Sequence, residues 1–127
     1  MYWKYKIKIC PRKGRCVIAD SDIPKNMMIG EYEGKLITAK EGDSRIDDTY
    51  IFFFKVGTKW MAIDATEEPR SISLGRLYNH SRLHPNIQPR IMGYRIHFFT
   101  LRDIKKGEEL VFDYGGKNSR EHKWLNE

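Results

Sequence analysis

The chain has 127 residues, of which 40% are hydrophobic and 31% are charged, and its formal net charge is +6. This size and composition are typical of one globular domain and exclude a disordered tail. No apolar run approaches the length of a membrane span and the N-terminus is unlike a signal peptide, so we expect an intracellular protein that does not enter a membrane. The net positive charge is compatible with binding to a polyanion, and equally with a basic surface that only keeps the protein soluble.

Alternation of apolar and polar residues predicts that β-strands dominate the chain. In residues 3–9, Trp3, Tyr5, Ile7 and Ile9 fall on one face and lysines on the other, which is typical of a half-buried strand. The same pattern predicts further strands, in chain order, at residues 27–33, 50–56, 60–64, 94–101 and 109–113.

Glycine-containing turns separate some of these predicted strands. Gly57-Thr58 predicts a hairpin turn, and Met92-Gly93 predicts the start of another. Because strands do not alternate with long helical patterns, we expect a mainly β fold rather than a doubly wound parallel sheet. Helix is expected only as one turn within residues 71–78 and as a short segment at 118–126.

Two similar segments stand far apart in the sequence. Residues 22–26 (DIPKN) precede a run ending in Glu31-Tyr32, and residues 103–107 (DIKKG) precede one ending in Asp113-Tyr114. Both predict a tight turn that leads into a strand. Nothing else in the sequence supports a true repeat.

The cysteines and histidines do not predict a metal site. Cys10 and Cys16 are too few for a disulfide framework. His80 and His84 are four residues apart, but Pro85 makes an unbroken helix there unfavourable. Ser81 beside His80 is not a catalytic triad, and no GxGxxG or P-loop is present.

Three polar clusters interrupt the apolar pattern, at residues 13–16 (KGRC), 78–81 (YNHS) and 113–116 (DYGG). With their surroundings they form KGRCVIA, EYEG, LGRLYNHS and EELVFDYG, whose order and spacing resemble the SET-domain protein lysine methyltransferases. The resemblance covers about residues 13–125. LGRLYNHS, IDATEE and HKWL are most similar to the branch that monomethylates lysine 20 of histone H4 and lacks a cysteine-rich zinc module.

The resemblance implies a single SET-type domain over residues 1–127, with a flanking strand at 1–12 and a flanking helix at 117–127. The implied fold has small curved sheets, and its DYG segment threads beneath the loop that holds NHS. Such a knot-like crossing is rare in proteins, and strand patterns alone would not predict it.

The resemblance also implies a function, namely methylation of a lysine in an H4-like histone tail with S-adenosylmethionine as the methyl donor. Tyr114 matches the family's catalytic tyrosine, Tyr50 matches a tyrosine of the lysine channel, and Phe112 matches a position that controls the product. The residues matching cofactor contacts are Lys13, Gly14, Arg15, Cys16, Tyr32, Asn79, His80, Tyr114 and Trp124. No metal ligand is implied.

This chain departs from the family pattern at three places. Cys16 replaces a glycine and either narrows the cofactor pocket or is simply a small apolar strand residue. The insert between Gly34 and Tyr50 is short, and its acidic residues either steer a basic histone tail or form a solvated loop. These acidic residues are Glu41, Asp43, Asp47 and Asp48.

The third departure is Phe112, where the H4-directed branch has tyrosine. A tyrosine hydroxyl can hold a water molecule that fills the lysine channel and keeps out methylated amines. Phenylalanine removes that anchor, so we expect a second and even a third methyl transfer.

Two other functions compete with catalysis. One is an inactive SET module that binds histone tails or nucleosomes. The other is a nucleic-acid-binding module, or a DNA contact made by the enzyme itself, through the basic N-terminal segment. That segment contains Lys4, Lys6, Lys8, Arg12, Lys13 and Arg15. A nuclear location follows from the expected histone substrate.

Overall fold

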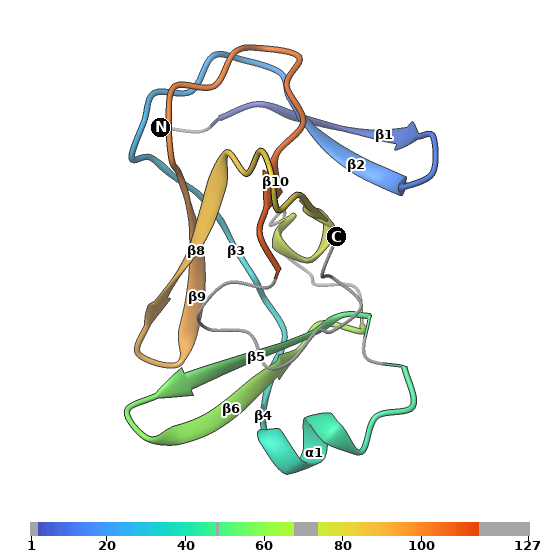
Figure 1. Cartoon of the computed structure of the whole chain (residues 1–127), viewed down its shortest axis with the longest axis vertical. Helices are drawn as coiled ribbons and strands as arrows, with labels where there is room; N and C mark the ends of the chain where they lie inside the picture. The colour runs from blue at the N-terminus through green and yellow to red at the C-terminus, as the bar shows by residue number, and fades with distance from the viewer. Residues whose placement is uncertain (1–2, 48, 68–73, 115–127) are drawn as a thin grey trace.

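The computed structural model describes residues 3–47, 49–67 and 74–114. Within these ranges, short strands form four small sheets, and the helical parts are one turn of α-helix and one of 3-10 helix (Figure 1). The predicted mainly β fold of small curved sheets is therefore confirmed. The expected C-terminal helix and Trp124 lie outside the described residues.

The N-terminal hairpin joins β1 (Tyr5–Cys10) to β2 (Gly14–Ala19), with Cys10 opposite Gly14. Its far end projects from the body of the molecule (Figure 1). Trp3 and Tyr5 pack against the core, but Ile7 and Ile9 are 48% and 80% exposed. The prediction of a buried face along residues 3–9 is thus wrong beyond Tyr5.

Two three-stranded antiparallel sheets make up most of the remaining fold. One has the order β3 (Met28–Glu31), β9 (Arg95–Thr100), β8 (Ile87–Met92). The other has the order β4 (Lys35–Thr38), β6 (Lys59–Asp64), β5 (Ile51–Val56). Gly57 and Gly93 adopt positive φ angles in the β5–β6 and β8–β9 turns, which confirms both predicted hairpins.

A helical turn absent from the sequence prediction, α1 (Ala39–Asp43), follows β4. Thr38 and Glu41 form a reciprocal capping box, in which the Thr38 side chain accepts from the Glu41 N–H and the Glu41 carboxylate accepts from the Thr38 N–H. Gly42 packs against Phe53, where a Cβ atom would lie 2.7 Å from the ring. Glu41, one of the acidic residues considered for steering a histone tail, therefore has a local structural role.

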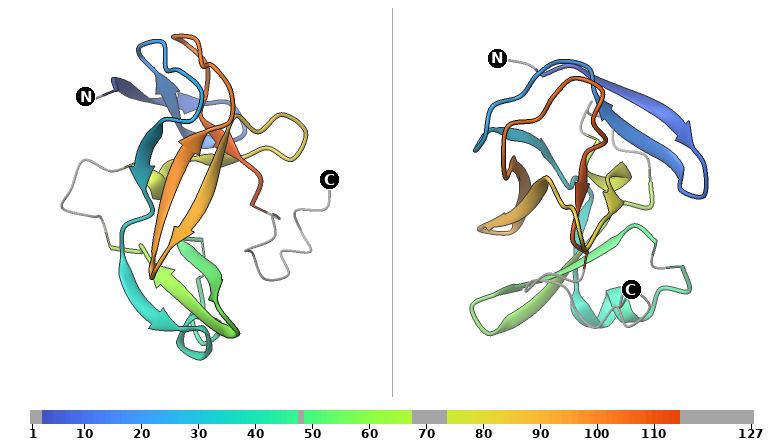
Figure 2. Two further views of the ribbon diagram at one scale, coloured as in Figure 1. Left: turned by 90° about the vertical axis from the view of Figure 1, so that its left-hand side faces the viewer. Right: turned by 45° about the horizontal axis from the view of Figure 1, so that its top comes forward.

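The chain crosses itself at the centre of the molecule, near η1 (Gly75–Leu77). There β10 (Val111–Phe112) pairs in parallel with β7 (Asn79–His80). Just before β10, Leu110 donates its N–H to the carbonyl of Val17 in β2. The segment leading to Tyr114 is thus held between the N-terminal hairpin and the segment after η1, as the predicted knot-like crossing requires (Figure 2).

The two similar turns found in the sequence face each other. Ile23 and Ile104 exchange backbone hydrogen bonds of 2.9 and 2.8 Å. The carboxylate of each turn's aspartate also accepts a backbone N–H of the opposite turn, Asp103 from Lys25 and Asp22 from Lys106, both at 2.9 Å. The similarity reflects mutual pairing of two turns.

One aromatic and aliphatic core connects the sheets. Its fully buried members include Val17, Ile23, Phe54, Tyr78, Ile87, Ile96, Phe98, Ile104 and Leu110. Because members come from the hairpin, both three-stranded sheets and the crossing, this core fixes the parts relative to one another. In the described ranges no helix has the length and apolarity needed to span a membrane.

Candidate active site

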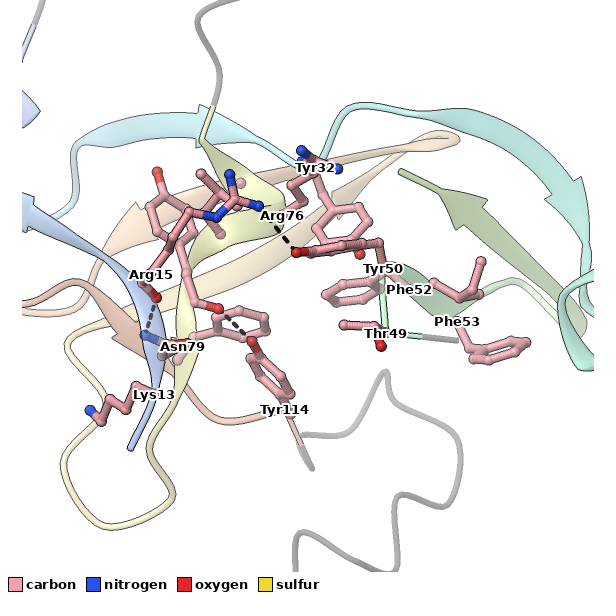
Figure 3. A pocket seen from close by; sticks show the side chains of 15 residues that line it. Lys13, Arg15, Tyr32, Thr49, Tyr50, Phe52, Phe53, Arg76, Asn79 and Tyr114 are labelled. Atoms are coloured by element: carbon pink, nitrogen blue, oxygen red, sulfur yellow. Dashed lines mark hydrogen bonds between the residues drawn. The ribbon is translucent and has the colours of Figure 1, made fainter. Parts of the chain in front are cut away.

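A cavity of about 280 Å³ opens where the hairpin, β5, η1, β7 and β10 meet (Figure 3). One part of its wall is aromatic and the other is polar. Its lining residues are Lys13, Arg15, Tyr32, Thr49, Tyr50, Ile51, Phe52, Phe53, Gly75, Arg76, Leu77, Tyr78, Asn79, Phe112 and Tyr114. Pockets of this mixed kind are typical of small-molecule sites.

The aromatic part is a continuous cluster of rings. The Phe112 ring lies 4.6 Å from that of Tyr114 and 6.2 Å from that of Phe52, measured between centroids. Tyr32 meets Phe52 edge to face at 5.1 Å. Phe112 and Tyr32 are only 4% and 5% exposed, so the aromatic wall of the cavity is closely packed.

Tyr114 stands at the end of this cluster and is fixed at both its backbone and its hydroxyl. Its N–H donates to Nδ1 of His80 at 3.0 Å, and its hydroxyl donates to the carbonyl oxygen of Tyr78 at 2.5 Å. Burial raises the pKa of Tyr114 to about 12, so the hydroxyl remains a hydrogen-bond donor at neutral pH. Since Nδ1 of His80 accepts this hydrogen bond, a neutral His80 carries its own proton on Nε2.

Tyr50 lies across the cavity between two arginines. Arg15 donates to its hydroxyl at 3.3 Å, and the Arg76 guanidinium lies 4.7 Å from the centre of its ring. Arg76 also donates to the carbonyls of Ala65 and Thr66, which holds it in place. Sequence reasoning did not single out Arg76, although it lies within the LGRLYNHS motif.

The polar part of the cavity is formed by Lys13, Arg15 and Asn79. The Asn79 side-chain amide donates to the carbonyl of Arg15 at 2.9 Å and to the carboxylate of Glu109 at 2.8 Å. Glu109 in turn pairs with Lys13 at 2.7 Å. Two cations and an oriented amide thus surround one end of a cavity whose other end is aromatic.

The chain is similar to known proteins over most of its length. Residues 14–115 match the family model described as the SET domain. The chain belongs to the SET-domain family. The match begins at the start of β2 and ends beside Tyr114, so it includes every residue that lines the cavity except Lys13.

Similar proteins include the Drosophila melanogaster histone-lysine N-methyltransferase Set8 (36% identical) and the Danio rerio N-lysine methyltransferase KMT5A-A (34% identical). The alignments cover 89% and 94% of this SET domain but only 18% and 38% of those relatives, so the chain spans a minor part of their length. The crystal structure of CpSET8 from Cryptosporidium superposes with a TM-score of 0.80 at 40% identity, covering 94% of this chain and 61% of that one.

Most of the predicted site residues of this SET domain line the one cavity. Tyr50, Phe112 and Tyr114 share the aromatic part with Tyr32, and the polar part contains Lys13, Arg15 and Asn79. Gly14 and His80 are adjacent in sequence to lining residues without lining the cavity themselves. Their predicted cofactor contacts, and that of Trp124, stay predictions.

Cys16 is the small strand residue that one interpretation of the sequence expected, because it lies in β2. It is fully buried, does not line the cavity and forms a disulfide with Cys10 across the hairpin. Two cysteines are too few for a disulfide framework, but this one bond cross-links the hairpin that carries Lys13 and Arg15. Pairing could not be predicted because the Cα atoms come to 6.0 Å only through the β1–β2 register.

The groups present match the chemistry of S-adenosylmethionine. Lys13 and Arg15 are suited to its carboxylate, Asn79 to its amino group, and the aromatic surface to the less polar remainder. The Tyr78 carbonyl and the Tyr114 hydroxyl place two oxygen atoms beside the aromatic part of the cavity. The cavity is thus suited to an amino-acid-bearing cofactor.

Proposed function

We propose that this SET domain transfers a methyl group from S-adenosylmethionine to a lysine side chain of an H4-like histone tail. The observation that carries the proposal is the hydroxyl of Tyr114, held by the Tyr78 carbonyl at the junction of the aromatic and polar parts of one cavity. The relatives of this chain named as histone-lysine and N-lysine methyltransferases support the reaction class.

The bound cofactor would supply a methyl group attached to a positively charged sulfur. After the transfer, the rest of the cofactor would leave as a neutral thioether. A new N–C bond forms as the C–S bond breaks, so the lysine nitrogen must arrive with its lone pair free. The protein has to align the amine with the methyl group and exclude water. Tyr114 and the Tyr78 carbonyl are suited to orient the amine and the transferring methyl.

The surroundings of the cavity also favour the neutral amine. A dry aromatic wall disfavours an ammonium ion, and the guanidinium groups of Arg15 and Arg76 beside Tyr50 repel it. The proton is then lost to solvent before the amine enters the narrow part. This assigns Arg76 an electrostatic role in addition to its contacts with Ala65 and Thr66.

The number of methyl groups depends on Phe112. Its ring is packed between Phe52, Phe98 and Tyr114 and carries no polar atom that could anchor a water molecule. A methylated amine can therefore turn in the space that an anchored water would fill. We expect products beyond monomethyl-lysine.

A histone-directed enzyme would act in the nucleus and meet nucleosomal DNA. Lys6 and Lys8 in β1 are exposed, as is Lys4 just before it, and their alternation along the chain puts them on one face, which suits contact with phosphates. Lys6 also pairs with Asp20 at 3.3 Å. This DNA contact would assist catalysis on nucleosomes rather than replace it.

The decisive experiment is transfer of labelled methyl from S-adenosylmethionine to free histones and to nucleosomes. The full chain should label histone H4, and Tyr114→Phe should abolish most of the label, whereas the exposed-tyrosine control Tyr94→Phe should not. Cofactor binding without transfer would instead support an inactive module that binds histone tails. DNA binding without cofactor binding would support a nucleic-acid-binding module.

A further inference from the structure

Glu109 lies behind the polar part of the cavity and contacts two of its lining residues. One carboxylate oxygen accepts from the Asn79 amide at 2.8 Å, and the other accepts from the Lys13 ammonium at 2.7 Å. The side chain is 19% exposed. Glu109 thus contacts both an amide and an ammonium group of the polar part of the cavity.

The backbone of Glu109 is held from two directions. The buried Asn86 donates its side-chain amide to the Glu109 carbonyl at 2.7 Å, and its side-chain oxygen accepts from the Val111 N–H at 2.9 Å. On the opposite side, Glu109 forms a β-bridge with Ile18. Glu109 lies just before β10, and these backbone contacts on both sides hold the residue that carries the carboxylate in place.

The contact with Glu109 determines which way the Asn79 amide faces. A side-chain NH₂ group has two hydrogens, and here one goes to the Arg15 carbonyl and the other to Glu109. Exchanging the nitrogen and oxygen would set an oxygen against two acceptors, so the orientation is fixed. Asn79 can offer a ligand only its oxygen, which is an acceptor.

We propose that Glu109 is a positioning residue that makes this end of the cavity selective for the α-ammonium group of the methyl donor's amino-acid moiety. This deepens the proposed function and rests on it. With Glu109 in place, Asn79 accepts from the ammonium, and Lys13 and Arg15 are left to bind the carboxylate. The negative charge of Glu109 further favours the cationic group and balances Lys13.

The test measures binding rather than turnover. Isothermal titration compares S-adenosylhomocysteine with the same thioether lacking the α-amino group, in the wild-type chain, Glu109→Ala and Glu109→Gln. The wild type should prefer the amino-bearing ligand. In Glu109→Ala this preference should fall about tenfold or more, mainly through weaker binding of the amino-bearing ligand. Glu109→Gln should be intermediate, because it keeps an acceptor for Asn79 but loses the charge.

Glu108→Gln is the matched control, since this neighbouring carboxylate pairs with Arg102 and does not contact Asn79 or Lys13. It should keep the wild-type preference. If both Glu109 variants lose affinity for the two ligands equally, Glu109 is merely structural and the inference is overturned. If the wild type binds neither ligand, the proposed function fails as well. If Glu109→Ala does not fold, Glu109→Gln provides the test, through the ratio of its affinities for the amino-bearing ligand and for the ligand without the amino group.

Discussion

The hydroxyl of Tyr114 donates to the carbonyl of Tyr78, with 2.5 Å between the two oxygens, although 36 residues separate them in sequence. The bond joins the crossing segment to the segment before β7. It places a phenol that is tied to the backbone at the edge of an aromatic cavity.

Replacing Tyr114 by phenylalanine should therefore remove the hydroxyl and little else. The ring contacts with Phe112 and His80 remain possible, so the fold and cofactor affinity should change little. We expect methyl transfer to fall about 100-fold, the usual effect of losing one preorganised donor. Single-turnover kinetics with labelled cofactor measure this step. An unchanged rate constant would remove Tyr114 from the reaction.

Phe112→Tyr should restrict the product. The new hydroxyl would stand in a wall formed by the rings of Phe52, Phe98 and Tyr114, where it can hold a water molecule within the channel. That water leaves less room for a methylated amine. Mass spectrometry of a reacted H4 peptide should show di- or trimethyl-lysine for the wild type and monomethyl-lysine for the variant. Wild-type product that stops at one methyl group would contradict the role of Phe112.

Strand positions were largely predictable because alternation records which residues face the core. The predicted strands at 50–56, 60–64 and 94–101 correspond to β5, β6 and β9 with shifts of one residue at their ends. The strand predicted at 109–113 is reduced to β10, because Leu110 bonds to Val17 of the N-terminal hairpin instead. That hydrogen bond is long-range, and no local pattern indicates it.

Of the four strands that the sequence did not predict, β2, β4 and β8 have local reasons for being missed. β2 begins with the polar residues Gly14 and Arg15, which hide its alternation. β4 is only four residues long, and β8 contains Pro89, a residue that argues against strand structure from sequence alone. Each forms because a neighbouring strand supplies its hydrogen bonds.

The site residues, like the strands, were predictable only where the sequence carried a recognisable pattern. Tyr50, Asn79 and Tyr114, which the family resemblance singles out, line one cavity, and periodicity alone would not have grouped them. Glu109 was not singled out as a site residue from the sequence. Its neighbours Asn79 and Lys13 are 30 and 96 residues away, so only the folded chain shows the contact.

Stability should decline in alkali because buried tyrosines must ionise when the chain unfolds. Burial raises the pKa of both Tyr5 and Tyr114 to about 12, against about 10 in an unfolded chain. Both groups therefore contribute stability that is complete below about pH 10 and is lost as the pH rises towards 12.

Urea unfolding of the wild type and Tyr5→Phe between pH 8 and 12 measures this dependence. Phenylalanine has no proton to lose, so the variant's free energy of unfolding should fall less steeply above pH 10. Lysines titrate in the same range but are common to both proteins, and their effect cancels in the comparison. Parallel curves would show that Tyr5 is not protected by burial.

The disulfide between Cys10 and Cys16 should stabilise the hairpin that carries Lys13 and Arg15. Closing a loop of this length restricts the unfolded chain and contributes about 2 kcal/mol. Reduction should thus lower the free energy of unfolding by about that amount, and Cys10→Ala should resemble the reduced wild type and no longer respond to reductant.

Urea unfolding with and without dithiothreitol measures the effect, and thiol titration in denaturant counts the bonds. Before reduction the purified chain should give no reactive thiol, and afterwards it should give two, because its other residues include no cysteine. Two thiols before reduction would show that the hairpin holds its register without the bond. In that case Cys16 stabilises the fold only as a buried apolar side chain.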